Sequence, residues 1–168
     1  MPFFALLKKE LYRFSSIWVQ TIVGPLSTAL LYQLIFGSQL SGINTGLAHV
    51  NYATFLIPGL VIMQILLNSF GNGSSSLIQS KYSGNLIFIL MAPISPSSMY
   101  LAYLTASIIR GLVVGTAVFI GICWFGSFML EQVWAIFYFA ILGSAITGGL
   151  GIIAGIWCEK FDQLAGFQ

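Results

Sequence analysis

Four long apolar stretches divide the chain, and they cover residues 17–36, 55–78, 99–125 and 133–157. Each is close to the length of about 20 residues that an α-helix needs to cross the hydrocarbon core of a bilayer. A strand of a transmembrane β-barrel would instead alternate apolar and polar residues over about ten positions. The pattern therefore predicts an all-α integral membrane protein with four transmembrane helices.

Residues 3–16, before the first apolar stretch, have a different pattern. Helical spacing places Lys9 and Arg13 on one face and apolar side chains on the other, namely Phe3, Phe4, Leu7, Leu11 and Phe14. This arrangement is typical of an amphipathic helix that lies in the membrane interface. We therefore expect an interfacial entry helix and no cleaved leader.

Residues 79–98 separate the second and third apolar stretches. Gly84, Pro93 and Pro96 break regular structure here, although residues 86–91 are wholly apolar. We expect an ordered connection that contains a short buried helix.

Composition strengthens the membrane interpretation. Of the 168 residues, 58% are hydrophobic and 6% are charged, and the mean hydropathy is +0.95. A soluble domain carries about 25% charged residues, so lipid must solvate much of this chain. The net charge of +2, without a basic cluster interleaved with aromatic residues, argues against nucleic-acid binding.

The basic residues predict an orientation. With four spans, the residues that fall on one side of the membrane are Lys8, Lys9, Arg13, Lys81 and Lys160, whereas His49 and Glu131 fall on the other. By the positive-inside rule, the N-terminus and residues 79–98 are expected in the cytoplasm.

Arg110 is the charged residue that falls well inside a predicted span. It follows the start of that span by about 16 Å along the helix axis, which predicts a position near mid-membrane, where an arginine costs about 2.5 to 3.5 kcal/mol. We therefore expect its side chain to face protein. It either locks helix packing by bonding to carbonyl groups or contacts a substrate or gate.

Two pairs of glycines have the G-x-x-x-G spacing that lets helix backbones approach closely, Gly111 with Gly115 and Gly151 with Gly155. They predict either packing within the chain or a specific contact between two copies.

Four uncharged polar residues occur within the first two spans, Gln20, Gln33, Gln64 and Asn68. Such side chains avoid lipid, so they either bond across helix interfaces or line a transport pathway.

No residue pattern predicts catalysis or metal binding. The sequon at Asn72 falls at the cytoplasmic end of its span, where no glycan is added, and His49 lacks partners at ligand spacing. The sequence contains neither a nucleophile–base set nor a Walker lysine motif, so we expect no bound cofactor and no ATP hydrolysis by the chain itself.

Several short segments occur in the order found in one family. They are residues 11–14 (Leu-Tyr-Arg-Phe), 17–21 (Ile-Trp-Val-Gln-Thr), 36–37 (Phe-Gly), 55–60 (Phe-Leu-Ile-Pro-Gly-Leu), 92–93 (Ala-Pro), 110–111 (Arg-Gly) and 161–162 (Phe-Asp). The chain thus resembles the permeases of ABC-2 type exporters. Phe-Leu-Ile-Pro-Gly-Leu is the most specific of these matches.

The resemblance implies a six-span permease of the bacterial inner membrane, of which this chain holds the first four spans, as a fragment or a truncated product. It implies a permease homodimer with cytoplasmic ATPase subunits, which use ATP and magnesium to export lipids, lipid-linked glycans or drugs. It also implies that residues 80–93 couple to the ATPase, with Lys81, Asn85, Ala92 and Pro93 as candidate contacts. Ile87 and Phe88 stand where relatives usually carry acidic residues.

Two other functions stay open. A secondary transporter or channel component would bury acidic or histidine residues in its spans, whereas here the sequence predicts only a buried Arg110. A structural remnant without transport activity is the other alternative, because two spans of the family fold are missing.

Overall fold

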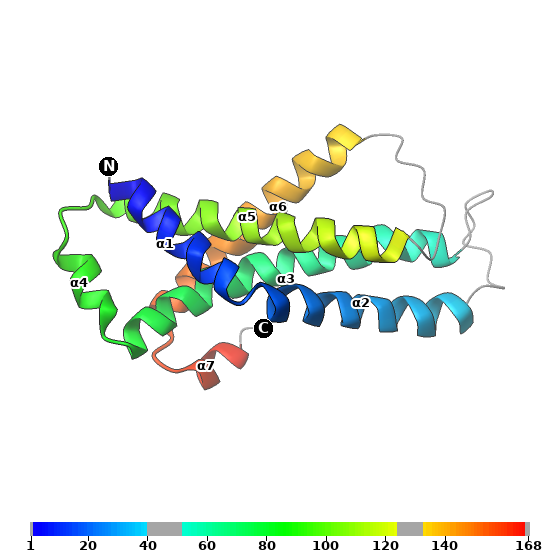
Figure 1. Ribbon diagram of the computed structural model, residues 1–168, viewed down its shortest axis with the longest axis horizontal. Helices are drawn as coiled ribbons and strands as arrows, with labels where there is room; N and C mark the ends of the chain where they lie inside the picture. Colours follow the sequence, from blue (N-terminus) through cyan, green and yellow to red (C-terminus); the bar gives the residue numbers. More distant parts are fainter. Residues whose placement is uncertain (1, 40–51, 124–132, 167–168) are drawn as a thin grey trace.

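The computed structural model describes residues 2–39, 52–123 and 133–166, and His49 and Glu131 lie outside this part. The helices of the described part are α1 (Pro2–Ser16), α2 (Trp18–Gln39), α3 (Tyr52–Tyr82), α4 (Asn85–Met91), α5 (Pro96–Cys123), α6 (Val133–Trp157) and α7 (Phe161–Ala165) (Figure 1). Four of them, α2, α3, α5 and α6, are long and apolar enough to cross a membrane. The prediction of an all-α protein with four such helices is therefore confirmed.

The central helix is α3, which packs against α2, α5 and α6. It has 31 residues and is therefore about 46 Å long, well above the thickness of the hydrocarbon core. Its glycine- and serine-rich stretch, residues 71–76, remains helical, and α3 continues to Tyr82 beyond the predicted end of the span at residue 78. Small residues such as Gly73, Ser74 and Ser76 are buried there, because neighbouring helices approach closely. The stretch is thus a packing surface of the helix.

All four predicted packing glycines face α3. A Cβ added to Gly111 or Gly115 on α5 would meet Ser69 or Ile65, and one added to Gly151 on α6 would meet the Phe70 carbonyl oxygen at 2.3 Å. A Cβ at Gly155 would lie 2.9 Å from the carbonyl oxygen of Ser74. These glycines therefore allow close packing within the chain.

The connection between α3 and α5 contains α4. Gly84 turns the chain before α4 with a φ of 71°, a left-handed conformation that glycine adopts without strain, and Pro96 begins α5. The short helix expected here is present, but the expected burial is wrong, since Phe88 is 73% exposed and no residue of α4 is buried. Among the described helices, none covers the exposed side chains of this apolar run, Ile87, Phe88, Leu90 and Met91.

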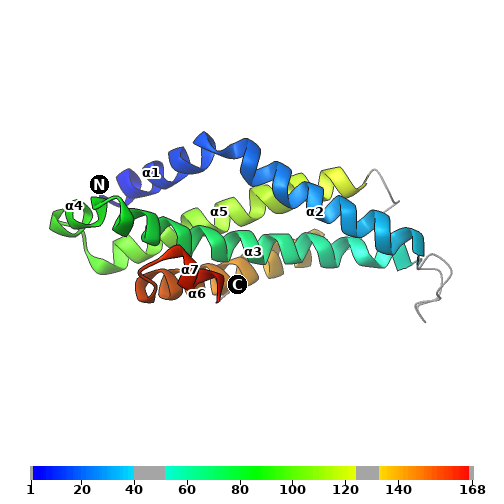
Figure 2. The ribbon, with the colours of Figure 1, turned by 90° about the horizontal axis from the view of Figure 1, so that it is seen from below.

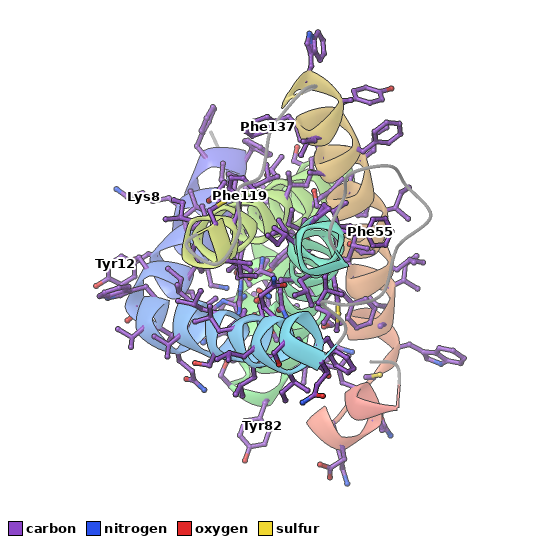
Figure 3. The ribbon with its side chains drawn as sticks, turned by 90° about the vertical axis from the view of Figure 1, so that its right-hand side faces the viewer. Lys8, Tyr12, Phe55, Tyr82, Phe119 and Phe137 are labelled. Atoms are coloured by element: carbon purple, nitrogen blue, oxygen red, sulfur yellow. The ribbon has the colours of Figure 1, made fainter. Side chains whose placement is uncertain are left out.

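The short helices lie toward one end of the long helices, where Figures 1 and 2 show α1, α4 and α7. Lys8, Lys9 and Arg13 belong to α1, Lys81 to the last turn of α3, and Lys160 directly precedes α7. Viewed along the bundle, the aromatic side chains of Tyr12 and Tyr82 point outward (Figure 3), and Phe55 and Phe137 are each about half exposed. An apolar outer surface of this kind suits a lipid environment.

Candidate functional site

Glu10 of α1 lies in a buried polar cluster and is only 1% exposed. Its Oε2 atom accepts a 2.6 Å hydrogen bond from Ser76 Oγ of α3 and forms a 3.0 Å ion pair with Arg13 Nη2. Its Oε1 atom lies 3.7 Å from Lys9 Nζ. A carboxylate thus joins α1 to the centre of the bundle.

The orientation of α1 explains this burial. Phe4 and Tyr12 are 62% and 75% exposed, whereas Glu10 and much of Arg13 face α3 and α5. The exposed face of α1 also carries Lys8 and Lys9, and Leu6 is buried beside Glu10, so each face of the helix is mixed in character. Lipid can solvate the exposed apolar side chains, which leaves the inward face free to hold two charged groups that pair with each other. The sequence placed Arg13 on the polar face of α1 without indicating what that face contacts. In the structure its guanidinium group points into the bundle and contacts Glu10, Asn72 and Gln79.

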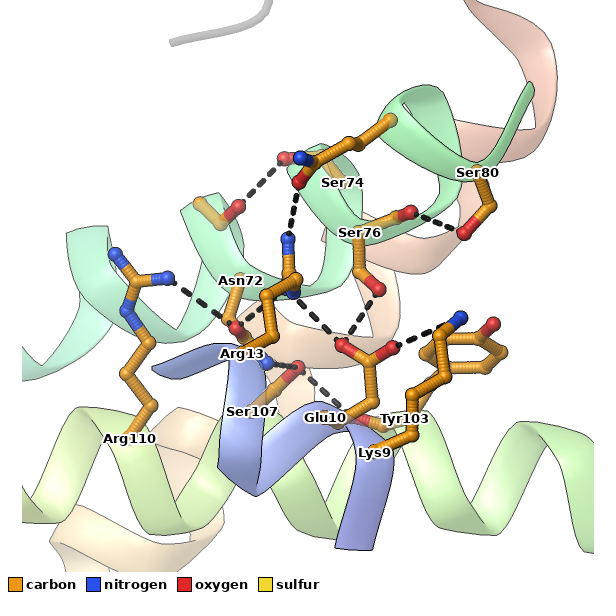
Figure 4. Close-up of polar contacts among 12 residues, drawn as sticks. Lys9, Glu10, Arg13, Asn72, Ser74, Ser76, Ser80, Tyr103, Ser107 and Arg110 are labelled. Carbon is orange, nitrogen blue, oxygen red and sulfur yellow. Dashed lines mark hydrogen bonds and ion pairs between the residues drawn. The ribbon is translucent and has the colours of Figure 1, made fainter. Parts of the chain in front are cut away.

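Asn72 of α3 connects two arginines. Its Oδ1 atom accepts hydrogen bonds from Arg13 Nη2 at 3.0 Å and from Arg110 Nη1 at 3.3 Å, and its Nδ2 atom donates to Ser107 Oγ at 3.3 Å (Figure 4). Arg13 also donates to Gln79 Oε1 at 3.2 Å. The cluster therefore joins α1, α3 and α5 through side chains that are far apart in the sequence.

Arg110 faces protein, as expected, and lies beside the junction of α1 and α2. Its guanidinium carbon lies 5.9 Å from the centre of the Phe14 ring, and Phe14 belongs to the last turn of α1, just before α2 begins at Trp18. With 22 residues, α2 is about 33 Å long and matches the bilayer core. The guanidinium group of Arg110 is therefore level with the start of α2, although Arg110 lies near the middle of α5.

The four pathway candidates do not form one surface. Gln20 is exposed on α2, Gln33 and Gln64 are buried, and the half-buried Asn68 donates a hydrogen bond to the main-chain oxygen of Gln64. The hydrogen bond that the structure describes for Arg110 goes to Asn72 and to none of these four.

The candidate coupling residues lie in two different environments. The ammonium group of Lys81 donates to main-chain oxygens at the end of α6 and so is engaged within the chain. Asn85 is exposed at the start of α4, and Ala92 and Pro93 line an open groove of about 420 Å³ between α1 and α4. Three of the four candidates thus lie at the exposed connection.

Sequence reasoning missed Glu10, Asn72, Ser76 and Ser107 as members of a site. One signal was present, since Glu10 is the only acidic residue before Glu131. Asn72 was noted only for its sequon, and nothing in the sequence marks the two serines.

The cluster has no arrangement suited to catalysis. It contains no His or Cys, and within the described ranges no three His, Cys, Asp or Glu side chains come together to hold a metal. Lys9 and Arg13 flank the carboxylate of Glu10, and Arg110 joins the same cluster through Asn72, an arrangement that suits the binding of negative charge and the joining of helices.

Comparison with known proteins adds an independent finding. The sequence profile of the ABC-2 type transporter family matches residues 1–168. The inner membrane transport permease YadH of Escherichia coli K12 is 33% identical over 159 residues, as are YadH of Escherichia coli O157:H7 and of Shigella flexneri. The alignment covers 94% of this chain and 61% of each relative, so the chain spans less than two thirds of their length. No solved structure matches significantly. The match over the whole chain, together with the membrane-spanning helices, shows that the chain belongs to the ABC-2 type transporter family.

Proposed function

We propose that this chain forms part of the permease subunit of an ATP-driven exporter in a bacterial cytoplasmic membrane. The supporting observation is that a chain of the ABC-2 family has four span-length helices with an apolar outer surface. Two copies of the permease would enclose the pathway, and the cargo would be a lipid, a lipid-linked glycan or a drug. The chain itself performs no enzymatic step.

The cytoplasmic ATPase would dock on α4. Four apolar residues of this short helix are more than 60% exposed, Ile87, Phe88, Leu90 and Met91. Isolated apolar residues on a surface need no explanation, but a contiguous exposed group marks an interaction site. The contact would be mainly apolar, and ATP and magnesium would bind to the partner.

The orientation follows from charge. Lys8, Lys9 and Arg13 belong to α1, Lys81 lies in the last turn of α3, just before α4, and Lys160 directly precedes α7, so these residues lie toward the same end as α4. The positive-inside rule puts this end, including the N-terminus, in the cytoplasm, where the ATPase is found.

The proposal is tested by co-purification after mild detergent extraction. We expect a P-loop ATPase to co-purify with the wild-type chain and to be lost with Phe88→Glu. Tyr12→Glu is the matched control, because Tyr12 is an equally exposed aromatic residue on α1. Absence of any ATPase from the wild-type preparation would contradict the exporter function, whereas equal loss in both variants would contradict docking on α4.

A secondary transporter is the second candidate function, because the structure contains a buried acidic residue that the sequence did not predict. The sequence predicted only Arg110 to be buried, but Glu10 is buried as well. Buried acidic residues carry ion coupling in such transporters. Glu10, however, is paired with Arg13 at the end of the bundle. Transport in vesicles that requires ATP and persists when ion gradients are dissipated would exclude this candidate.

A further inference from the structure

The polar cluster carries more positive than negative charge. Glu10 lies within ion-pair distance of Lys9 and Arg13, whereas the described polar partner of Arg110 is the uncharged amide oxygen of Asn72. The other acidic side chains in the described part, Glu159 and Asp162, are exposed beyond the end of α6 and form no ion pair with Arg110. The charge of Arg110 is thus not neutralised by a carboxylate of the described chain.

Both arginines also have unused hydrogen-bond donors. The Nε atoms of Arg13 and Arg110 are buried without a hydrogen-bond partner. A guanidinium group has five N–H donors, and Figure 4 shows a second terminal nitrogen of Arg110 directed away from Asn72. The Phe14 ring offers only a weak attraction to this cation. Buried charge and unpaired donors together are costly, so a negatively charged acceptor would stabilise the site.

The surroundings point to the source of that acceptor. Arg110 is partly exposed and lies level with the junction of α1 and α2, which corresponds to the headgroup region if α2 spans the core. Ile17 and Trp18 come directly after the end of α1 and are 44% and 58% exposed. An apolar surface therefore begins beside the two arginines. Basic pockets between helices on the cytoplasmic side commonly bind lipid headgroups, because that leaflet contains anionic lipids.

We propose that Arg110 and Arg13 together bind the phosphate group of an anionic membrane lipid, whose acyl chains lie along the apolar surface that begins at Ile17 and Trp18. Guanidinium groups match phosphate oxygens in geometry as well as in charge. The bound lipid would supply the negative charge that the cluster lacks. This site goes beyond the exporter function and holds whether or not an ATPase binds.

The first test measures lipid binding to the detergent-purified chain by native mass spectrometry. We expect wild-type protein to retain phosphatidylglycerol in preference to phosphatidylcholine and Arg110→Gln to lose about tenfold in affinity. Lys8→Gln removes the same charge from an exposed position on α1 outside the cluster, and we expect it to behave as wild type. Equal retention of phosphatidylglycerol by all three proteins would overturn the proposal.

The second test uses only wild-type protein, so it does not depend on the folding of a variant. Phenylglyoxal modifies accessible arginines, and peptide mass spectrometry reports which ones. We expect phosphatidylglycerol to protect Arg110 and Arg13, while phosphatidylcholine and inorganic phosphate do not. Protection by inorganic phosphate at similar concentration would show a site for free phosphate, and lack of protection by any additive would show that no anion binds. Either outcome would overturn the lipid site.

Discussion

The ammonium group of Lys81 donates a 2.6 Å hydrogen bond to the main-chain oxygen of Ile156 and a 2.9 Å bond to that of Cys158. The last carbonyl groups of a helix have no donor within that helix, and the negative end of the helix dipole attracts a cation. Lys81 thus caps α6 from the last turn of α3. It joins two helices at the point where the connection to α4 begins.

Lys81→Met should lower the free energy of unfolding by about 1 kcal/mol, because the cap and its favourable interaction with the helix dipole are lost. The measurement is thermal unfolding in detergent. Lys8→Met is the control, since Lys8 is exposed and its loss should change little. If the two variants unfold alike while Lys81→Met alone loses ATPase binding, Lys81 acts as a coupling residue instead.

Glu10→Gln should lower the free energy of unfolding by about 3 kcal/mol, because it leaves the largely buried Arg13 without its carboxylate partner. Glutamine can still accept the hydrogen bond from Ser76, so the loss reports mainly on charge. Unfolding of Glu10→Gln is compared with that of Glu159→Gln, whose side chain is exposed.

A double-mutant cycle with Arg13→Gln checks the pairing of the two charges. Removing both charges should cost less than the sum of the single changes, since neither partner is then left alone. Additive effects would mean that Glu10 and Arg13 do not interact in the folded protein.

The transmembrane helices could be predicted because lipid imposes a simple requirement. A helix must present apolar side chains over the thickness of the core, and each of the four long stretches contains a sufficiently long apolar segment. Arg110 was identified for the same reason, since a charge stands out in such a stretch. The glycine spacing in α5 and α6 similarly indicated surfaces of close approach, and the structure directs both toward α3.

The polar cluster could not be predicted, because helical periodicity shows which residues share a face but not what that face contacts. For α1 the pattern separated apolar from charged residues, and burial of Glu10 depends on α3 and α5 lying beside it. Asn72 belongs to the cluster only because three elements distant in sequence meet there. The exposure of α4 was missed for a related reason, since an apolar run alone does not show whether another helix covers it.

Ser95→Cys, in the turn before α5, should react with a membrane-impermeant maleimide in inside-out vesicles and not in intact spheroplasts. The residue is exposed at the end of the bundle that bears the basic side chains, which the positive-inside rule puts in the cytoplasm. Gln39→Cys, at the far end of α2, should show the opposite labelling. Both changes are made with Cys123 and Cys158 replaced by serine. Reversed labelling would invert the proposed orientation.

Gly151→Ala should strongly reduce stability, because the added Cβ would meet the main-chain oxygen of Phe70 at 2.3 Å and its α-carbon at 3.1 Å. Backbone atoms cannot rotate away as a side chain can, so α6 would have to separate from α3. Gly59→Ala is the matched control, since nothing lies within 4 Å of its added Cβ and alanine favours a helix by up to about 1 kcal/mol. In detergent, the temperature of thermal unfolding should therefore fall for Gly151→Ala and should not fall for Gly59→Ala. Equal stability would mean that α3 and α6 are not in close contact at Gly151, and that this glycine is available to pack against another chain.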